Sequence, residues 1–111
     1  MSFNIRYNNP DDGVHAWSHR KDKIIDLIKY YDPDLFGVQE ALHDQIEYLH
    51  KNLEKYQWVG VGRDDGKNNG EYTAVFCKRE RFELIESNDF WLSETPEVAG
   101  SFGWDAACVR I

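Results

Sequence analysis

Alternating apolar and polar residues open the chain. From Ser2 to Tyr7 every second residue is apolar, a period of two that is typical of a strand with one buried face. The polar face of this strand carries Asn4 and Arg6. The pattern therefore predicts a strand over residues 2–7 that presents an amide beside a guanidinium.

A second strand is predicted over residues 34–40, where an apolar run ends abruptly in Gln39-Glu40. The carboxyl end of a buried strand is a place where α/β proteins often bind ligands. A carboxylate there suits a hard cation such as Mg²⁺, and an Asn on an adjacent strand can orient a phosphate or a water around the ion. Asn4 and Glu40 are therefore the candidate metal-binding and catalytic pair.

The apolar residues that follow each of these strands have helical spacing. Residues 18–30 form one such segment, with Ser18 as a candidate N-cap and Asp32-Pro33 as the stop. A second amphipathic helix is predicted over residues 42–53, where leucine and isoleucine residues form one stripe. Strand, helix, strand, helix is the order typical of an α/β protein.

The second part of the chain has strand patterns without a helical one. Four strands are predicted, over residues 56–62, 72–78, 82–92 and 105–111. A start that contains helices, followed by an antiparallel run of strands, fits one half of a sandwich in which two sheets are flanked by helices. The predicted fold class is α/β, of the α+β type.

The two opening strands resemble those of the endonuclease/exonuclease/phosphatase superfamily, which has the fold of deoxyribonuclease I. Three further segments carry the resemblance in the same order: Trp17-Ser-His-Arg20, Phe90-Trp-Leu-Ser-Glu-Thr-Pro96 and Trp104-Asp-Ala-Ala-Cys-Val-Arg110. The resemblance spans nearly the whole chain, and it is specific for the family but not for the substrate. It implies half of a four-layer α-β-β-α sandwich.

The resemblance also implies a divalent-metal-dependent phosphoesterase, which hydrolyses a phosphodiester or a phosphomonoester bond. Glu40 matches the family's ligand for Mg²⁺ or Mn²⁺, and Asn4 matches the residue that orients the phosphate. The Asp-x-Asn pair and the closing Asp-His of the family do not occur in residues 1–111. We therefore expect these residues to be the amino-terminal portion of one domain whose carboxy-terminal half is absent, and to be incomplete for catalysis alone.

Two more residues are candidates for substrate binding. Arg6 can contact a substrate phosphate, although a structural ion pair is the commoner role of such an arginine. Glu71 follows an Asn-Gly turn and is similar to the Gly-Glu near the site mouth in related members. Alternatives stay open for the first pair too, since Glu40 can favour the start of the next helix and Asn4 can satisfy backbone groups at a strand end.

Composition narrows the choice of partner. A net charge of −7 over 111 residues argues against an extended basic nucleic-acid surface, because phosphate backbones attract lysine and arginine. The expected partner is a phosphoester substrate on a small molecule, a lipid head group or a nucleic acid end. No segment approaches the length of a membrane span. Four tryptophans keep one alternative open, a non-catalytic relative that binds protein or carbohydrate.

Overall fold

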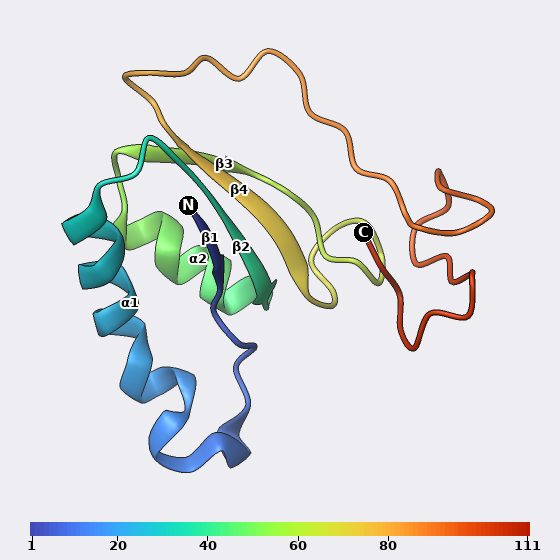
Figure 1. The fold of residues 1–111 in the computed structure, drawn as a ribbon, viewed down its shortest axis with the longest axis horizontal. Coiled ribbons are helices and arrows are strands. Elements are labelled where there is room, and N and C mark those ends of the chain that lie inside the picture. The colour runs from blue at the N-terminus through green and yellow to red at the C-terminus, as the bar shows by residue number, and fades with distance from the viewer.

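The computed structural model describes all residues, 1–111, and its centre is one sheet of four strands (Figure 1). The strands lie in the order β1-β2-β4-β3. β1 and β2 are parallel, whereas β4 pairs antiparallel with both β2 and β3. Their bounds are β1 (Ser2–Asn4), β2 (Leu35–Ala41), β3 (Tyr56–Val59) and β4 (Tyr72–Lys78).

Two helices cover one face of this sheet (Figure 1). α1 (Trp17–Tyr31) is the crossover that two neighbouring parallel strands require, here β1 and β2. A short 3₁₀ helix, η1 (Pro10–His15), precedes α1, and α2 (His43–Asn52) follows β2 directly. Each helix turns an apolar side to the sheet, with Ile24, Ile25 and Ile28 of α1 and Ile46 and Leu49 of α2 buried in the core.

The start of α1 differs from the prediction. The predicted N-cap, Ser18, lies inside the first turn, and Ala16 occupies the cap position. Ala16 is buried and its N–H donates to the carbonyl of Gly13, so the chain is already fixed at the end of η1 before the helix begins. The predicted stop is confirmed, because Asp32 adopts a left-handed conformation (φ 43°) in which its N–H bonds the carbonyl of Ile28.

The core lies between the sheet and the helices. Five residues of the two central strands are 0% exposed on this side: Phe36, Val38, Ala41, Ala74 and Phe76. The rings of Phe36 and Phe76 stack with their centroids 4.9 Å apart, whereas Val75 on the other face of β4 is exposed. The molecule measures 40 × 40 × 19 Å, and its thinnest dimension is that of one helix layer on one sheet, each about 10 Å thick.

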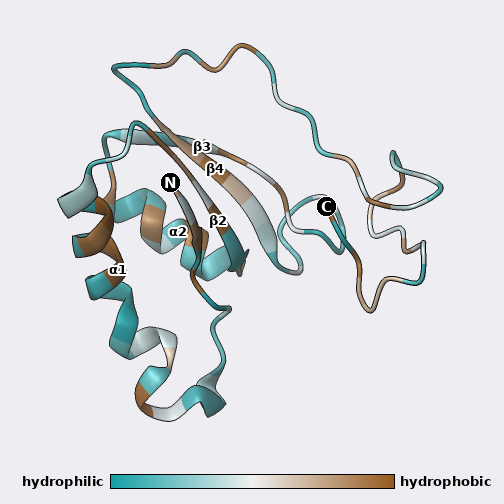
Figure 2. Ribbon diagram, in the orientation of Figure 1, coloured by the Kyte–Doolittle hydropathy of each residue, from teal (hydrophilic) through white to brown (hydrophobic).

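Residues 79–111, called the tail below, contain no helix or strand. The strands predicted over residues 82–92 and 105–111 are therefore wrong for this chain. A strand needs backbone hydrogen bonds to a neighbour, and one such bond joins these two segments, from the N–H of Leu92 to the carbonyl of Arg110 (3.0 Å). Much of the apolar part of the tail stays exposed, and Figure 2 shows it as brown patches along an extended path.

The first part of the prediction is confirmed in most of its elements, but the strand expected over residues 2–7 ends at Asn4, because Arg6 has a left-handed conformation with a φ of 58°. Both helices form within two residues of the expected bounds, and β2 and β4 form where strands are expected. The strand expected over residues 56–62 ends at Val59, because Gly60 departs from the extended conformation with a φ of 139°. None of the helices is long and apolar enough to cross a membrane.

Candidate functional site

The carboxyl ends of β1 and β2 lie side by side. The two strands are parallel, and their register places Asn4 opposite Gln39, so the next residue, Glu40, comes within reach of the Asn4 side chain. The Nδ2 of Asn4 donates a hydrogen bond to the Oε1 of Glu40 over 2.8 Å. The structure therefore brings together the amide and the carboxylate that the sequence singles out.

A β-bulge in β2 places the Glu40 side chain outside the core. In a regular strand, Glu40 would share the buried face of Phe36 and Val38, because side chains alternate with a period of two. The register with β4 shifts between Val38 and Ala41, and Glu40 has a φ of 60°. The bulge turns Glu40 out of the core, while Ala41 takes the buried position opposite Tyr72.

Backbone geometry also orients Asn4. Its Oδ1 accepts the N–H of Arg6 over 2.9 Å, and this leaves Nδ2 directed at Glu40. The segment after β1 is held in turn by Gln45, a fully buried residue of α2. The Nε2 of Gln45 donates to the carbonyl of Arg6 (2.9 Å), and its Oε1 accepts the N–H of Asn8 (2.8 Å). The amide of Asn4 is thus fixed by contacts on both sides.

The pair lines a hollow of about 230 Å³. Glu71 lies in the same hollow, at the start of β4, and the structure therefore brings this predicted residue to the pair as well. The Oε2 of Glu71 accepts a hydrogen bond from the Nη1 of Arg63 over 2.9 Å. The full lining is Asn4, Gln39, Glu40, Arg63, Glu71, Tyr72, Thr73, Val109, Arg110 and Ile111.

Arg6 does not line this hollow. Its Nε and Nη2 each lie 3.1 Å from a carboxylate oxygen of Asp12, and its guanidinium sits over the ring of Tyr7. The hydrogen bond with Asp12 raises the pKa of Arg6, and the same contact lowers the pKa of Asp12. The structural ion pair, which was the alternative for Arg6, is the arrangement present here, and a contact with substrate stays a prediction.

Sequence reasoning missed two residues of this region. Gln45 lacked any motif, and only its place on the apolar side of a helix could have drawn attention to it. Arg63 lies in the loop between β3 and β4, and its side chain is mostly buried. Residues 63–65, Arg-Asp-Asp, could have indicated it. An arginine beside two acidic residues in a loop is a candidate for an ion pair or for ligand binding.

The donors at the hollow suit a hard divalent cation in part. The chain has no group of three or more His, Cys, Asp or Glu side chains arranged to hold a metal ion. Glu40 nevertheless has one oxygen, Oε1, bound to Asn4 and a second one, Oε2, that accepts no hydrogen bond from the protein. Mg²⁺ is commonly held through one or two carboxylates together with waters and substrate phosphates, and Glu40 fits that role.

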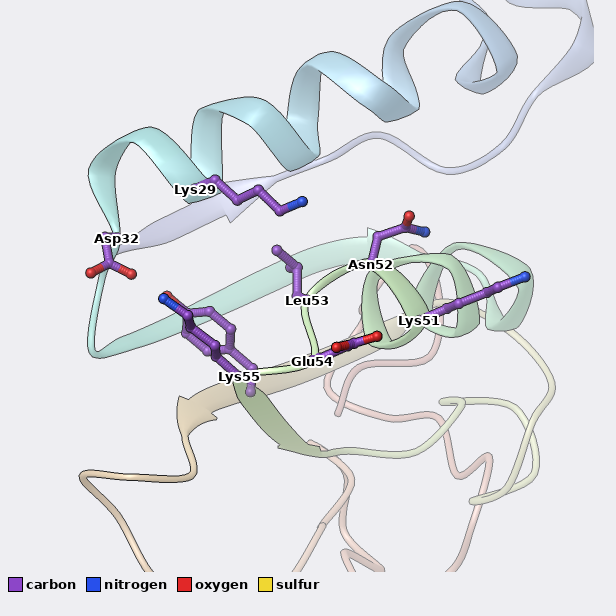
Figure 3. A pocket seen from close by; sticks show the side chains of 8 residues that line it. Lys29, Asp32, Lys51, Asn52, Leu53, Glu54 and Lys55 are labelled. Atoms are coloured by element: carbon purple, nitrogen blue, oxygen red, sulfur yellow. The ribbon is translucent and has the colours of Figure 1, made fainter.

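A larger hollow, of about 780 Å³, lies elsewhere (Figure 3). It opens between the ends of α1 and α2, beside the turn that leads into β3. This hollow is at the amino-terminal end of β2, opposite to the end that carries Glu40. Its charged side chains have mixed sign and belong to helix ends and to the turn before β3, so it lacks the convergent donors of the first hollow. Its lining is Lys29, Asp32, Lys51, Asn52, Leu53, Glu54, Lys55 and Tyr56.

The family model described as "Endonuclease/Exonuclease/phosphatase family" matches residues 1–106. The chain belongs to this family. The resemblance seen in the sequence and the predicted fold class, the deoxyribonuclease I-like α/β fold, are thereby confirmed. Members of the superfamily are hydrolases that act on phosphoester bonds, and they include phosphatases and nucleases.

Solved structures of family members superpose closely on the chain. An endonuclease/exonuclease/phosphatase from Bacteroides vulgatus is 48% identical with a TM-score of 0.96, and the match covers 98% of this chain and 42% of that one. A mannosyl-6-phosphatase from Bacteroides thetaiotaomicron is 42% identical with a TM-score of 0.93, and the match covers 98% of this chain and 41% of that one.

A curated relative lies further away. The Ccr4 subunit of the CCR4-Not complex of Mycosarcoma maydis, a 3'-5'-exoribonuclease, is 30% identical over 81 residues, which are 64% of this chain and 12% of that protein. The present chain thus spans about two fifths of the solved family members that it matches and a smaller share of this relative.

Proposed function

We propose that the chain supplies the metal-binding edge of a divalent-metal-dependent phosphoester hydrolase. The observation that carries the proposal is the 2.8 Å contact between the Nδ2 of Asn4 and the Oε1 of Glu40, at the shared carboxyl edge of β1 and β2. The bulge that turns Glu40 out of the core supports it, because a non-glycine residue with positive φ is uncommon and clusters at functional sites.

In this proposal Glu40 is the ligand of Mg²⁺ or Mn²⁺. When bound, the ion polarises a phosphoryl oxygen and offsets charge that develops on the leaving group. Asn4 donates to Oε1 of Glu40, so the other carboxylate oxygen, Oε2, stays available for the ion. Such fixing matters because groups that orient a metal ligand change metal affinity or activity by about 10- to 100-fold.

The substrate is a phosphoester, and two relatives point to different kinds. The mannosyl-6-phosphatase, at 42% identity, supports a phosphomonoester on a small molecule. The exoribonuclease, at 30% identity over a shorter stretch, supports a phosphodiester at a nucleic acid end. The net charge of −7 disfavours long contacts with nucleic acid, and we therefore favour a small or terminal phosphoester.

Catalysis by this chain alone is not part of the proposal. Hydrolysis needs groups that move a proton to or from the attacking water and the leaving group. The hollow contains no histidine, and its two carboxylates belong to Glu40 and Glu71. We propose that residues outside the chain complete the site and that residues 1–111 are inactive without them.

The alternative, a non-catalytic binding relative, finds less support. In the sequence, four tryptophans and an acidic surface supported a platform for carbohydrate or protein. Trp17 and Trp91 are buried and Trp58 packs against the core, whereas Trp104 is exposed. A single exposed indole is a small platform compared with the four rings that the sequence offers.

The test is Glu40→Gln in the full-length protein, with Glu80→Gln as the matched control. Glu80 is an exposed carboxylate two residues beyond the far end of β4. With a generic phosphoester and Mg²⁺ titrated, we expect Glu40→Gln to lower kcat/KM by at least about 100-fold, since even indirect changes at metal sites cost about 10- to 100-fold. The Mg²⁺ concentration for half-maximal rate should rise as well. Near-normal rates with unchanged Mg²⁺ dependence would refute the role of Glu40.

A further inference from the structure

Arg63 is a cation that faces the same hollow as Glu40. Its Nη1 donates to Glu71, but its Nε is buried and has no hydrogen-bond partner. The nearest carboxylate oxygen to Nε, Oδ1 of Asp64, lies 3.8 Å away, which is too far for a hydrogen bond. A buried donor without a partner is rare in native proteins and calls for a physical explanation, such as a missing ligand.

The backbone of Arg63 is held at both of its polar groups. Its N–H donates to the carbonyl of Glu71 over 3.2 Å, and its carbonyl accepts the indole Nε1 of Trp91 over 2.6 Å. Trp91 is 6% exposed and lies over Gly66, where a Cβ would come within 3.1 Å of the ring atom Cη2. A buried tryptophan of the tail thus fixes the position of one loop arginine.

A purely structural ion pair accounts poorly for this arrangement. One salt bridge to Glu71 uses a single N–H of the five that a guanidinium carries. A lysine would supply that contact as well, without leaving a buried donor unsatisfied. The planar fork of arginine is suited to oxyanions, which accept two parallel hydrogen bonds from it.

The charges around the hollow also favour an anion once a cation is present. The charged side chains of the lining are two guanidinium groups, Arg63 and Arg110, and two carboxylates, Glu40 and Glu71, so their charges cancel. A divalent ion on Glu40 would leave two positive charges uncompensated. A terminal phosphate carries close to two negative charges at neutral pH, whereas a phosphodiester carries one.

We propose that Arg63 binds the non-bridging phosphoryl oxygens of the substrate and thereby favours a terminal phosphate. The proposal rests on the proposed function, because it places Arg63 across the hollow from the metal ligand Glu40. The role of Arg63 and the role of Glu40 can be refuted separately. The binding of phosphate is measured at equilibrium, whereas the role of Glu40 is measured through the Mg²⁺ dependence of the rate.

The experiment compares Arg63→Met and Arg63→Lys with the full-length protein, using inorganic phosphate as the probe. Arg79→Met is the matched control, because the Nε of Arg79 contacts the carbonyl of Glu54, away from the hollow. Isothermal titration calorimetry with Mg²⁺ present should show phosphate affinity reduced roughly 10- to 100-fold in Arg63→Met, the effect of losing charge-assisted hydrogen bonds. The affinity for Mg²⁺ should stay the same, and so should phosphate binding in Arg79→Met.

Three results would overturn the inference. One is unchanged phosphate affinity in a folded Arg63→Met, and another is a full-length protein that binds no phosphate with Mg²⁺ present. The third is an equal loss of Mg²⁺ and phosphate affinity, which indicates a structural role. If Arg63→Met does not fold, Arg63→Lys decides the matter, because lysine keeps the pairing with Glu71 but lacks the fork, and full phosphate affinity in that variant contradicts the proposal.

Discussion

Residues 1–78 and the tail carry similar alternations of apolar and polar side chains but have different structures. In the first part, Phe36 and Phe76 are fully buried between a sheet and two helices. In the tail, Phe82 and Phe102 are 42% and 56% exposed and the backbone is irregular. Alternation of apolar and polar residues is therefore not enough to form a strand, because each strand also needs a neighbouring strand to pair with.

The tail contacts the first part at several places, among them the strand β3 at Gln57, the residue Asp34 and the hollow that contains Glu40. The end of the tail supplies Arg110 to the lining, and Trp91 bonds the carbonyl of Arg63 in the loop between β3 and β4. The tail is thus held by a small number of hydrogen bonds and by the buried ring of Trp91, whereas the first part is held by an apolar core between the sheet and the helices. One of the places where the two regions meet is the hollow in which the chemistry is proposed to occur.

The largest contrast is expected between core and tail phenylalanines. In the 111-residue chain, Phe36→Ala should lower the free energy of unfolding by roughly 3–5 kcal/mol, the cost of removing a buried aromatic ring. Phe102→Ala should change it by less than about 0.5 kcal/mol, as is usual for an exposed residue. Urea denaturation followed by circular dichroism gives both values.

The same pair of variants sharpens the comparison in the full-length protein. A cost for Phe102→Ala that rises toward that of Phe36→Ala would indicate that the apolar residues of the tail are buried by further chain. Equal costs already in the 111-residue chain would contradict the division into a packed part and an open tail.

Local patterns allowed the first part of the fold and the candidate pair to be predicted. Asn4 and Glu40 were predicted as a pair because Asn4 lies on the polar face of the first predicted strand, Glu40 ends the second, and both match residues of the family that the sequence resembles. The tail could not be predicted in the same way, since the pairing partner of a strand is not encoded in the strand itself.

The details of the site depend on tertiary contacts that the sequence only hints at. In a regular strand the alternation of side chains would place the Glu40 carboxylate on the buried face, with Phe36 and Val38. A buried charge is costly, and the bulge at Glu40 avoids this cost. The position of Arg63 depends on the hydrogen bond that its carbonyl accepts from Trp91, which lies 28 residues later in the chain. Such a contact between a loop and the tail has no periodic signature.

The second contrast concerns the junction of the two regions. Lys78, the last residue of β4, has its Nζ 2.9 Å from Oδ2 of Asp32 and 3.1 Å from Oδ1 of Asp34. The hydrogen bond from Lys78 lowers the pKa of Asp32, and the same contact raises the pKa of Lys78. A lowered carboxyl pKa stabilises the folded state above pH about 4 and is lost on acidification, whereas the raised lysine pKa stabilises it below pH about 10.

Lys78→Met should therefore flatten the acid side of the stability curve. The free energy of unfolding is measured between pH about 3 and 7, with Lys29→Met on the exposed end of α1 as the control. We expect the wild-type protein and the control to lose more stability than Lys78→Met over this interval. Parallel curves for all three proteins would show that this ion pair does not contribute to acid sensitivity.

The smallest contrast lies within the loop on which the tail docks. The Oδ1 of Asp65 accepts the N–H groups of Asn69 (3.0 Å) and Lys67 (2.8 Å), and these backbone hydrogen bonds lower the pKa of Asp65. Asp65→Asn keeps the acceptor oxygen but removes its charge, so the two bonds should weaken. We expect faster hydrogen exchange at the amides of Lys67 and Asn69, with the exchange of β4 and the midpoint of thermal unfolding unchanged.

Acid should reproduce this effect in the wild-type protein, because protonation of Asp65 at a pH below about 4 removes the same charge. The residues at which hydrogen exchange becomes faster then show how far the loop is coupled to the rest of the chain. Exchange that accelerates at Lys67 and Asn69 alone would show that this part of the loop is held by its own short contacts. Exchange that also accelerates in β4 would mean that the loop is coupled to the packed sheet. The position of Arg63 would then depend on the core as well as on Trp91.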